Sequence, residues 1–224
     1  MIKAIFWDND GVLVDTEHLY FEASRDALRQ VGIELSMEQF AHISLGLGKS
    51  SLCLAAEQGV NDDTLAALRQ HINRRYAELL QNGAAPMEGA SETLAALHGK
   101  VAMAIVTSSR RDHFDLIHRN NSLLGFFDFI LTREDYQHSK PNPEPYLKAL
   151  KVSGLRAEEC LVIEDTLRGF EAAHQAGLRC VVIPNRLAPD NEFNDAFQVI
   201  RDLQEVPPLV LAEAGLAAVP PPPA

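Results

Sequence analysis

The sequence is poor in cysteine, and it contains no long apolar run. Its three cysteines, Cys53, Cys160 and Cys180, are widely spaced and include no Cys-x-x-Cys pair, which indicates reduced core residues in a cytoplasmic protein. No apolar segment approaches the ~20 residues that span a bilayer. The first apolar run stops at Asp8, so the run is too short to be a secretory signal. We therefore expect a protein that does not act at a membrane.

Positive charge is also scarce. Lysine and arginine together number 20 against 31 aspartates and glutamates, for a formal net charge of −11. This balance argues against general nucleic-acid binding, which needs a basic face. It also means that the protein as a whole does not attract an anionic substrate over long range. Any anion site must therefore be built locally, from a metal ion, a lysine and backbone N–H groups.

The chain is rich in apolar runs that alternate with helical patterns. Apolar residues make up 46% of its 224 residues, enough to bury a substantial core. We expect strands at about 2–7, 101–106, 127–131, 160–164 and 179–183, with a weaker one near 197–200. We expect helices between most of them, at Ala90–Leu97, Arg111–Asn121, Glu144–Val152 and Leu167–Ala176. This alternation predicts an α/β fold whose core is a Rossmann-like parallel sheet with helices on both faces.

One long stretch between the first two strands reads as helical throughout. Its expected helices are Leu19–Val31, Met37–Ile43, Ser50–Gln58 and Leu65–Leu80, and Ser36 and Gln39 have the spacing of a capping box. We assign residues 1–15 and 85–210 to the α/β core, 16–84 to a helical cap domain, and the proline-rich 217–224 to a flexible tail. An insert at the carboxyl end of a strand stands over the ligand edge of the sheet, so the cap is placed to act as a lid.

The most informative motif lies where the first strand stops. Asp8 and Asp10 follow the run Ile-Lys-Ala-Ile-Phe-Trp and precede Gly11. Side chains two residues apart on a strand point the same way. Two like charges on one face repel, so the pair is costly without a cation nearby.

Three further strand or loop ends carry polar groups. The second strand ends in Thr107-Ser108-Ser109, whose hydroxyl and N–H groups suit an anion at a helix N-terminus. Lys140 is followed by Pro141, Pro143 and Pro145. These prolines stiffen the segment, so the lysine can be aimed at a ligand as a point charge. A later strand ends in Glu164-Asp165. If these ends meet, the carboxylates form an all-oxygen site that suits Mg²⁺.

In order and spacing, these four motifs resemble those of the haloacid dehalogenase superfamily over about residues 2–183. The helical insert resembles that superfamily's small α-helical cap. The resemblance implies that Asp8 is the nucleophile, which forms an aspartyl phosphate, and that Asp10 is the general acid and base. It also implies that Thr107 hydrogen-bonds the transferring phosphoryl group and that Lys140 offsets charge on Asp8 and on the phosphoryl oxygens. Asp8, the backbone carbonyl of Asp10 and Asp165 are the implied Mg²⁺ ligands, with Glu164 close by.

Within this family, Asp10 favours phosphoryl transfer, because the dehalogenases and phosphonate-cleaving members lack an acid there. We expect a Mg²⁺-dependent phosphatase of the β-phosphoglucomutase-like subgroup that hydrolyses a small phosphorylated metabolite, such as a sugar phosphate. Besides the hydroxyl residues Ser108 and Ser109, we expect Lys49 and Arg110 to contact the substrate.

Two alternatives stay open. A β-phosphoglucomutase-like mutase shares this cap and Asp10, although Tyr20 stands where such mutases commonly have a histidine. A phosphate-accepting signalling module also uses aspartate, threonine, lysine and Mg²⁺, although such modules are about half this length. The sequence leaves the oligomeric state open.

Overall fold

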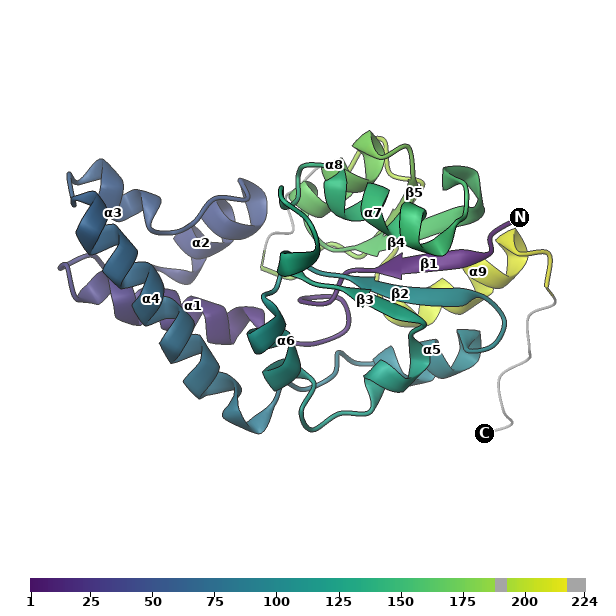
Figure 1. Cartoon of the computed structure of the whole chain (residues 1–224), viewed down its shortest axis with the longest axis horizontal. Coiled ribbons are helices and arrows are strands. Elements are labelled where there is room, and N and C mark those ends of the chain that lie inside the picture. Colours follow the sequence, from purple (N-terminus) through teal and green to yellow (C-terminus); the bar gives the residue numbers. More distant parts are fainter. Residues whose placement is uncertain (188–192, 217–224) are drawn as a thin grey trace.

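The computed structural model describes residues 1–187 and 193–216, so the expected tail at 217–224 lies outside the described residues. Six parallel strands form one sheet in the order β3-β2-β1-β4-β5-β6 (Figure 1). The strands are β1 Ala4–Trp7, β2 Ala102–Val106, β3 Phe129–Leu131, β4 Cys160–Glu164, β5 Arg179–Val182 and β6 Gln198–Val199. The predicted α/β fold with a parallel sheet is confirmed. Within the described residues, no helix has both the length and the apolar character that a bilayer crossing requires.

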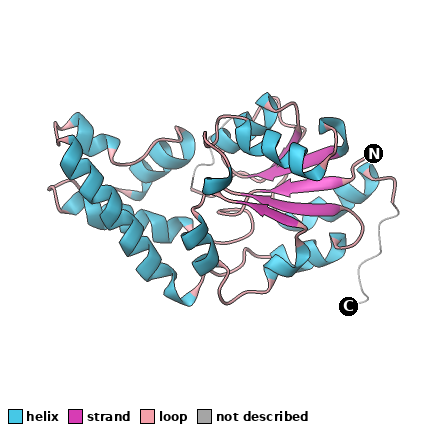
Figure 2. Cartoon of the chain, viewed as in Figure 1, coloured by secondary structure: helices cyan, strands magenta, loops and turns pink. Residues whose placement is uncertain are grey.

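Helices cover both faces of the sheet (Figures 1 and 2). Because side chains alternate along a strand, Ile5 and Trp7 of β1 enter one apolar cluster and Phe6 enters the other. The first cluster packs against α5 Ala90–Leu97, α6 Arg111–Ile117 and α9 Val206–Glu213. The second packs against α7 Glu144–Ser153 and α8 Leu167–Gln175. Burial on both faces explains why the strands are continuous apolar runs in the sequence.

Helix α9 is absent from the sequence prediction. It begins at Val206 and carries Pro207 and Pro208 in its first turn, where the missing N–H of proline costs no intrahelical bond. These prolines hide the helical signal. Several predicted ends were also wrong by one to four residues, and the helix expected to reach Asn121 ends at Ile117.

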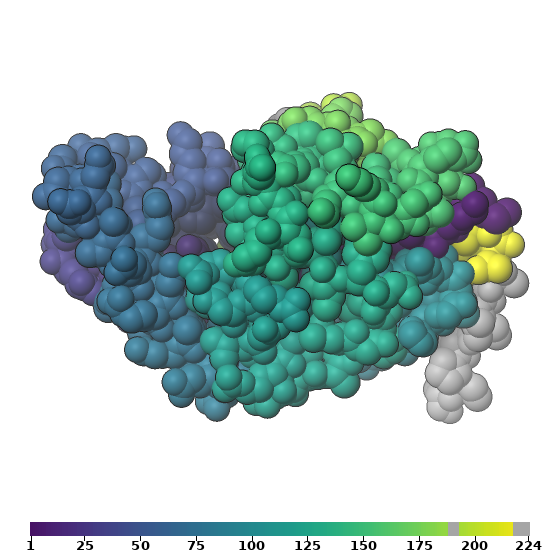
Figure 3. Space-filling view, in the orientation of Figure 1, coloured from purple at the N-terminus to yellow at the C-terminus, as the bar shows by residue number. Residues whose placement is uncertain are grey.

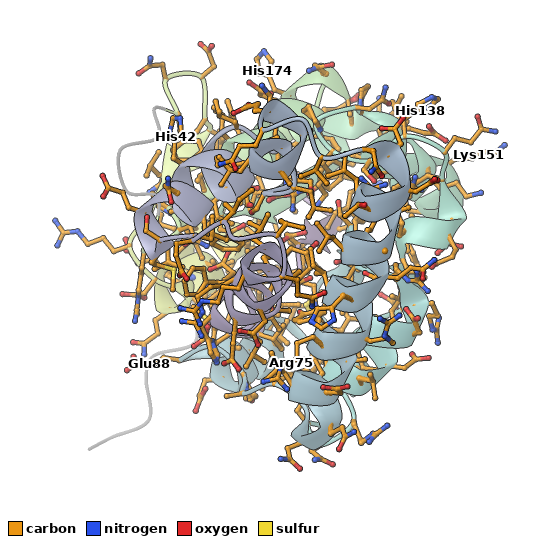
Figure 4. The ribbon with its side chains drawn as sticks, turned by 90° about the vertical axis from the view of Figure 1, so that its left-hand side faces the viewer. His42, Arg75, Glu88, His138, Lys151 and His174 are labelled. Atoms are coloured by element: carbon orange, nitrogen blue, oxygen red, sulfur yellow. The ribbon has the colours of Figure 1, made fainter. Side chains whose placement is uncertain are left out.

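Four α-helices lie between β1 and β2 in the chain, and we refer to them as the cap: α1 Glu17–Arg29, α2 Met37–Phe40, α3 Cys53–Glu57 and α4 Asp62–Leu79. The capping box of Ser36 and Gln39 is confirmed. The helix expected to end at Ile43 instead continues from α2 as a π-helix, Ala41–Gly46. Arg75 of α4, labelled in Figure 4, joins this helix to α1 through hydrogen bonds of 2.9 Å to Glu22 and 3.2 Å to Asp26. Short 3₁₀ helices occupy Leu80–Asn82, Leu123–Phe126, Arg133–Asp135, Ala157–Glu159 and Leu203–Glu205.

The two linkers between cap and core run side by side. The backbone N–H of Asp15 donates to the carbonyl of Ala85 at 3.0 Å, and the N–H of Met87 donates to the carbonyl of Leu13 at 2.9 Å. Val14 also forms an antiparallel bridge with Pro86. The chain therefore leaves the core and returns to it at one place, next to the end of β1.

Candidate active site

The polar strand ends expected from the sequence meet at the carboxyl edge of the sheet. Strand β1 lies between β2 and β4, so Asp8, Thr107 and Glu164 stand at the ends of three adjacent strands. The N–H of Asp8 continues the ladder by donating to the carbonyl of Ile163 at 2.9 Å. All three residues are buried, with exposed fractions of 9% or less.

Lys140 lies at the centre of this edge. Its ammonium Nζ donates to Asp8 Oδ1 and to Glu164 Oε1, both at 2.6 Å, and to the carbonyl of Val106 at 2.8 Å. The Tyr146 hydroxyl donates to the same Glu164 oxygen at 2.5 Å. Burial alone lowers the pKa of Lys140, but the two carboxylates outweigh it and raise the pKa above its usual value. The lysine therefore stays charged beside Asp8.

Asp8, Glu164 and Asp165 form a buried carboxylate cluster. One oxygen from each lies within 4.8 Å of the others. Burial, followed by repulsion from Glu164, raises the pKa of Asp8 to about 7 despite the neighbouring lysine. Burial also raises the pKa of Asp165 well above its usual value. Asp165 Oδ1 is buried without a hydrogen-bond partner among the described residues. Surplus negative charge and an unpartnered oxygen are what a divalent cation with oxygen ligands would satisfy.

Asp10 lies in different surroundings from Asp8. Its carboxylate accepts hydrogen bonds from the hydroxyls of Thr16 at 2.6 Å, Ser109 at 2.8 Å and Thr107 at 3.2 Å. It lies outside the three-carboxylate cluster, which leaves only its backbone carbonyl as a candidate cation ligand. Thr107 also accepts the backbone N–H of Ser109 at 3.0 Å, so the turn after β2 is held against Asp10.

A cleft of about 330 Å³ lies between the cap and this edge of the core, and Figure 3 shows the surface indented between the two parts. Asp8, Asp10 and Lys140 line it from the core. The four expected substrate-binding residues also line it: Lys49, Ser108, Ser109 and Arg110. Thr107 lines it too. The predicted residues Glu164 and Asp165 do not line the cleft; they are fully buried and adjoin it through Lys140 and Asp8. Arg110 is half-exposed and forms a 2.8 Å ion pair with Asp112.

Sequence reasoning missed four side chains at this site, namely Thr16, Glu17, Tyr146 and Asn185. Thr16 and Glu17 directly follow the first motif, and their position offered a signal. Asn185 comes three residues after β5, so the strand-end rule that identified Glu164 and Asp165 also applies to it. Tyr146 lies on α7, six residues after Lys140, and nothing in the sequence pattern marks it.

Gly11 makes close packing possible beneath these carboxylates. It has φ +80°, and a Cβ at this position would lie 2.1 Å from Asp165 Oδ2 and 2.9 Å from Glu17 Oε1. We expect Gly11→Ala to lower the free energy of unfolding by several kcal/mol, because backbone strain of about 1–2 kcal/mol adds to this clash. Gly59 has φ +81° with open space around it, so Gly59→Ala reports the strain alone. Urea denaturation of both variants measures the difference, and equal losses would contradict the clash.

Comparison with known proteins identifies the family. A family model described as haloacid dehalogenase-like hydrolase matches residues 5–183, which include β1 to β5, the cap and all four motifs. The chain belongs to this family.

Relatives of this haloacid dehalogenase-like hydrolase span most of its length. A phosphorylated carbohydrates phosphatase from Thermotoga maritima is 30% identical over 183 residues, which cover 79% of this chain and 82% of the relative. Protein CbbY from Rhodobacter capsulatus is 28% identical over 213 residues, covering 90% and 94%. A crystal structure of an Asp-to-Asn CbbY mutant from Rhodobacter sphaeroides, in complex with xylulose 1,5-bisphosphate, has a TM-score of 0.79 at 24% identity, covering 92% and 96%.

These findings confirm the resemblance seen in the four motifs. They also confirm the enzyme class, a haloacid dehalogenase-like hydrolase of phosphate monoesters. The CbbY structure shares the fold at an identity below 25%, so for this chain it speaks to the fold alone.

Proposed function

We propose that this protein is a Mg²⁺-dependent phosphatase that hydrolyses a small phosphorylated metabolite, such as a sugar phosphate, through an aspartyl phosphate on Asp8. One observation carries the proposal. The two carboxylates of the first motif lie in different surroundings, because Asp8 is bonded to Lys140 whereas Asp10 is held by three hydroxyls. Two carboxylates in different surroundings can take different roles, one as the nucleophile and the other as the general acid and base.

In the first step, an Asp8 oxygen attacks phosphorus while the bond between phosphorus and the ester oxygen breaks. Asp10 gives its proton to the departing ester oxygen, so the product leaves as an alcohol. The Lys140 ammonium offsets the charge that gathers on Asp8 and on the phosphoryl oxygens. Thr107, whose hydroxyl donates to Asp10 at 3.2 Å, donates to a phosphoryl oxygen instead when the substrate is bound.

In the second step, Asp10 takes a proton from a water molecule that attacks the phosphorus of the aspartyl phosphate. The acyl phosphate bond breaks, inorganic phosphate leaves, and Asp8 and the protonated Asp10 are restored. Splitting the reaction at a covalent intermediate replaces one difficult displacement by two easier ones. The cap lies over the cleft and limits the entry of bulk water. The phosphoryl group is then transferred to the one water molecule that Asp10 activates.

The residues present fit a magnesium ion. Asp8, Asp165 and the backbone carbonyl of Asp10 would hold it, with Glu164 beside them, because Asp165 Oδ1 is buried and unpartnered in the described structure. When bound, Mg²⁺ neutralises negative charge on the phosphoryl group and on the carboxylates. Glu164 Oε1 already accepts from Lys140 and Tyr146, so this glutamate chiefly holds the lysine in place.

The cleft and the relatives both support the proposed substrate class. Lys49 of the cap and Arg110 of the core line the cleft with Ser108 and Ser109, and these donors suit an anionic, hydroxyl-rich ligand. One relative is named as a phosphatase of phosphorylated carbohydrates. We further propose a cytoplasmic location, which suits the free cysteines Cys53, Cys160 and Cys180.

A panel assay tests the function. Phosphate release from p-nitrophenyl phosphate and from a set of sugar phosphates, with and without Mg²⁺, is expected to show steady, Mg²⁺-dependent turnover. With β-glucose 1-phosphate, release of glucose supports hydrolysis, whereas glucose 6-phosphate indicates the mutase. One stable phosphorylation without turnover indicates the signalling module. Tyr20, at the position where such mutases commonly have histidine, lines the cleft.

The rise in melting temperature caused by Mg²⁺ is expected to be larger near pH 8 than near pH 5.5. In the metal-free fold, burial raises the pKa of Asp8 from 3.8 to about 7. A raised carboxyl pKa costs stability as pH increases through this interval, because the unfolded chain loses its proton first. A cation relieves that cost, but below pH 7 it must first displace the proton. Differential scanning fluorimetry measures the shift, and equal shifts at both pH values would contradict this account.

A further inference from the structure

Asn185 connects the carboxylate cluster to the cap. It follows β5 and is 5% exposed. Its amide Nδ2 donates to Asp165 Oδ2 at 2.6 Å and also to Glu17 Oε1. Its backbone N–H donates to the Asp165 carbonyl at 3.1 Å. One side chain thus bonds a core carboxylate and the first residue of cap helix α1.

The local backbone fixes which way the amide faces. The N–H of Leu187 donates to Asn185 Oδ1 at 2.9 Å, so the oxygen is occupied by a donor and Nδ2 must face the two carboxylates. Both of its hydrogens then have acceptors. The orientation is therefore determined by the hydrogen-bond network and serves both acidic partners at once.

This arrangement leaves Asp165 with one free oxygen in a defined direction. Oδ2 accepts from Asn185, whereas Oδ1 is buried and has no partner within the described part of the chain. Gly11 closes the other side, because a Cβ there would meet Asp165, Glu17 and Asn185, each at 3.0 Å or less. Turning either carboxylate away would break its bond to Asn185.

We propose that Asn185 is a positioning residue that orients Asp165 toward the cation, and that it links cation binding to the cap through Glu17. The inference rests on the proposed Mg²⁺ dependence. A group that holds a metal ligand in place typically changes metal affinity by about 10–100-fold when it is removed. A ligand that favours one position of Asp165 also favours the position of every group bonded to it.

Few contacts separate Asn185 from the two long helices of the cap. Glu17 is the first residue of α1, and α1 is fixed to α4 by the bonds of Arg75 to Glu22 and Asp26. These two long helices form most of the cap and also line the cleft, through Tyr20 on α1 and Tyr76 on α4. Cation binding at Asp165 therefore steadies the surface that faces the substrate.

The first test measures cation binding without catalysis. The Mg²⁺ concentration that gives half of the full rise in melting temperature is expected to increase about tenfold or more in Asn185→Ala. Asn61→Ala is the matched control, because Asn61 caps α4 by accepting the N–H of Thr64 and lies away from the cluster. We expect Asn61→Ala to lower the melting temperature slightly and to keep the native Mg²⁺ midpoint.

The second test separates the two parts of the proposal. Hydrogen exchange at amides 17–24 is expected to slow about fivefold or more when Mg²⁺ is added to the native protein, because ligand binding suppresses local opening. Glu17→Ala removes the bond to the cap and keeps the bond from Asn185 to Asp165. We therefore expect this variant to lose the slowing of exchange while its Mg²⁺ midpoint stays within about threefold of the native value.

The outcomes are distinct. A Mg²⁺ midpoint within twofold of the native value in Asn185→Ala overturns the positioning role. Slowing of exchange that persists in Glu17→Ala overturns the link to the cap. If the native protein itself shows no response to Mg²⁺, the proposed Mg²⁺ dependence fails, and this inference fails with it.

Discussion

The Asp8→Asn variant is expected to release no phosphate above the buffer rate, a loss of about 10⁵-fold or more. Asparagine has nearly the shape of aspartate but cannot form the acyl phosphate. The change leaves Lys140 bonded to Glu164 at 2.6 Å, so the centre of the site keeps an ion pair. Rapid quenching of the native enzyme with ³²P-labelled substrate should trap label on the peptide that contains Asp8, and the variant should trap none.

Stability distinguishes a lost nucleophile from a lost fold. Because burial and repulsion from Glu164 raise the pKa of Asp8, a neutral side chain there relieves unfavourable charge. The metal-free Asp8→Asn protein is therefore expected to melt at or above the native temperature at neutral pH. Asp15→Asn is the matched control, because Asp15 is exposed and its carboxylate pairs with His18 on the surface, and it should keep native activity. Native turnover in Asp8→Asn would refute the assignment.

The Asp10→Asn variant is expected to lose about 10³-fold in turnover with sugar phosphates. The amide keeps contacts with Thr16 and Ser109 but can neither give a proton to the leaving oxygen nor take one from water. p-Nitrophenolate leaves without a proton, so the first step with p-nitrophenyl phosphate should be impaired much less than the second. We therefore expect a burst of about one equivalent of p-nitrophenol per enzyme, followed by slow turnover.

Stopped-flow absorbance at 405 nm measures this burst. The aspartyl phosphate on Asp8 should accumulate to nearly full occupancy in Asp10→Asn, and in the native protein it should reach a lower occupancy that the ³²P label still detects. Loss of both burst and turnover, equal for alkyl and aryl phosphates, would contradict the acid and base role. The same measurement on Asp15→Asn controls for the removal of a carboxylate from this segment of the chain.

The sequence predicts the core well because burial on both faces leaves a strong signal. The strand at 160–164 and the helix at 90–97 have the predicted bounds. Prediction fails where local signals conflict with tertiary packing. Pro207 and Pro208 hide α9, whose apolar residues join the first core cluster beside α5. The π-helix at Ala41–Gly46 departs from the period expected of an α-helix.

At the site, sequence reasoning finds residues that stand next to a strand end. Asp8, Thr107 and Glu164 all follow that rule, and Asn185 would have followed it too. It does not find Tyr146, because the contact of this tyrosine with Glu164 depends on how α7 lies across the sheet. Nor does it reveal that Asp10 turns toward three hydroxyls. Such contacts arise between segments that are far apart in the sequence, and one sequence gives no information on their relative placement.

The two adjacent linkers between cap and core affect how the substrate range of such an enzyme can change. The backbone N–H of Asp15 donates to the carbonyl of Ala85, and Val14 bridges Pro86, so the segment between them leaves the core and returns to it at one joint. A foreign insert whose ends lie equally close together can join the core at this joint, provided that it supplies Asn185 with an acceptor in place of Glu17. Recombination at this joint would change which compounds are accepted and would leave the bond-breaking apparatus intact.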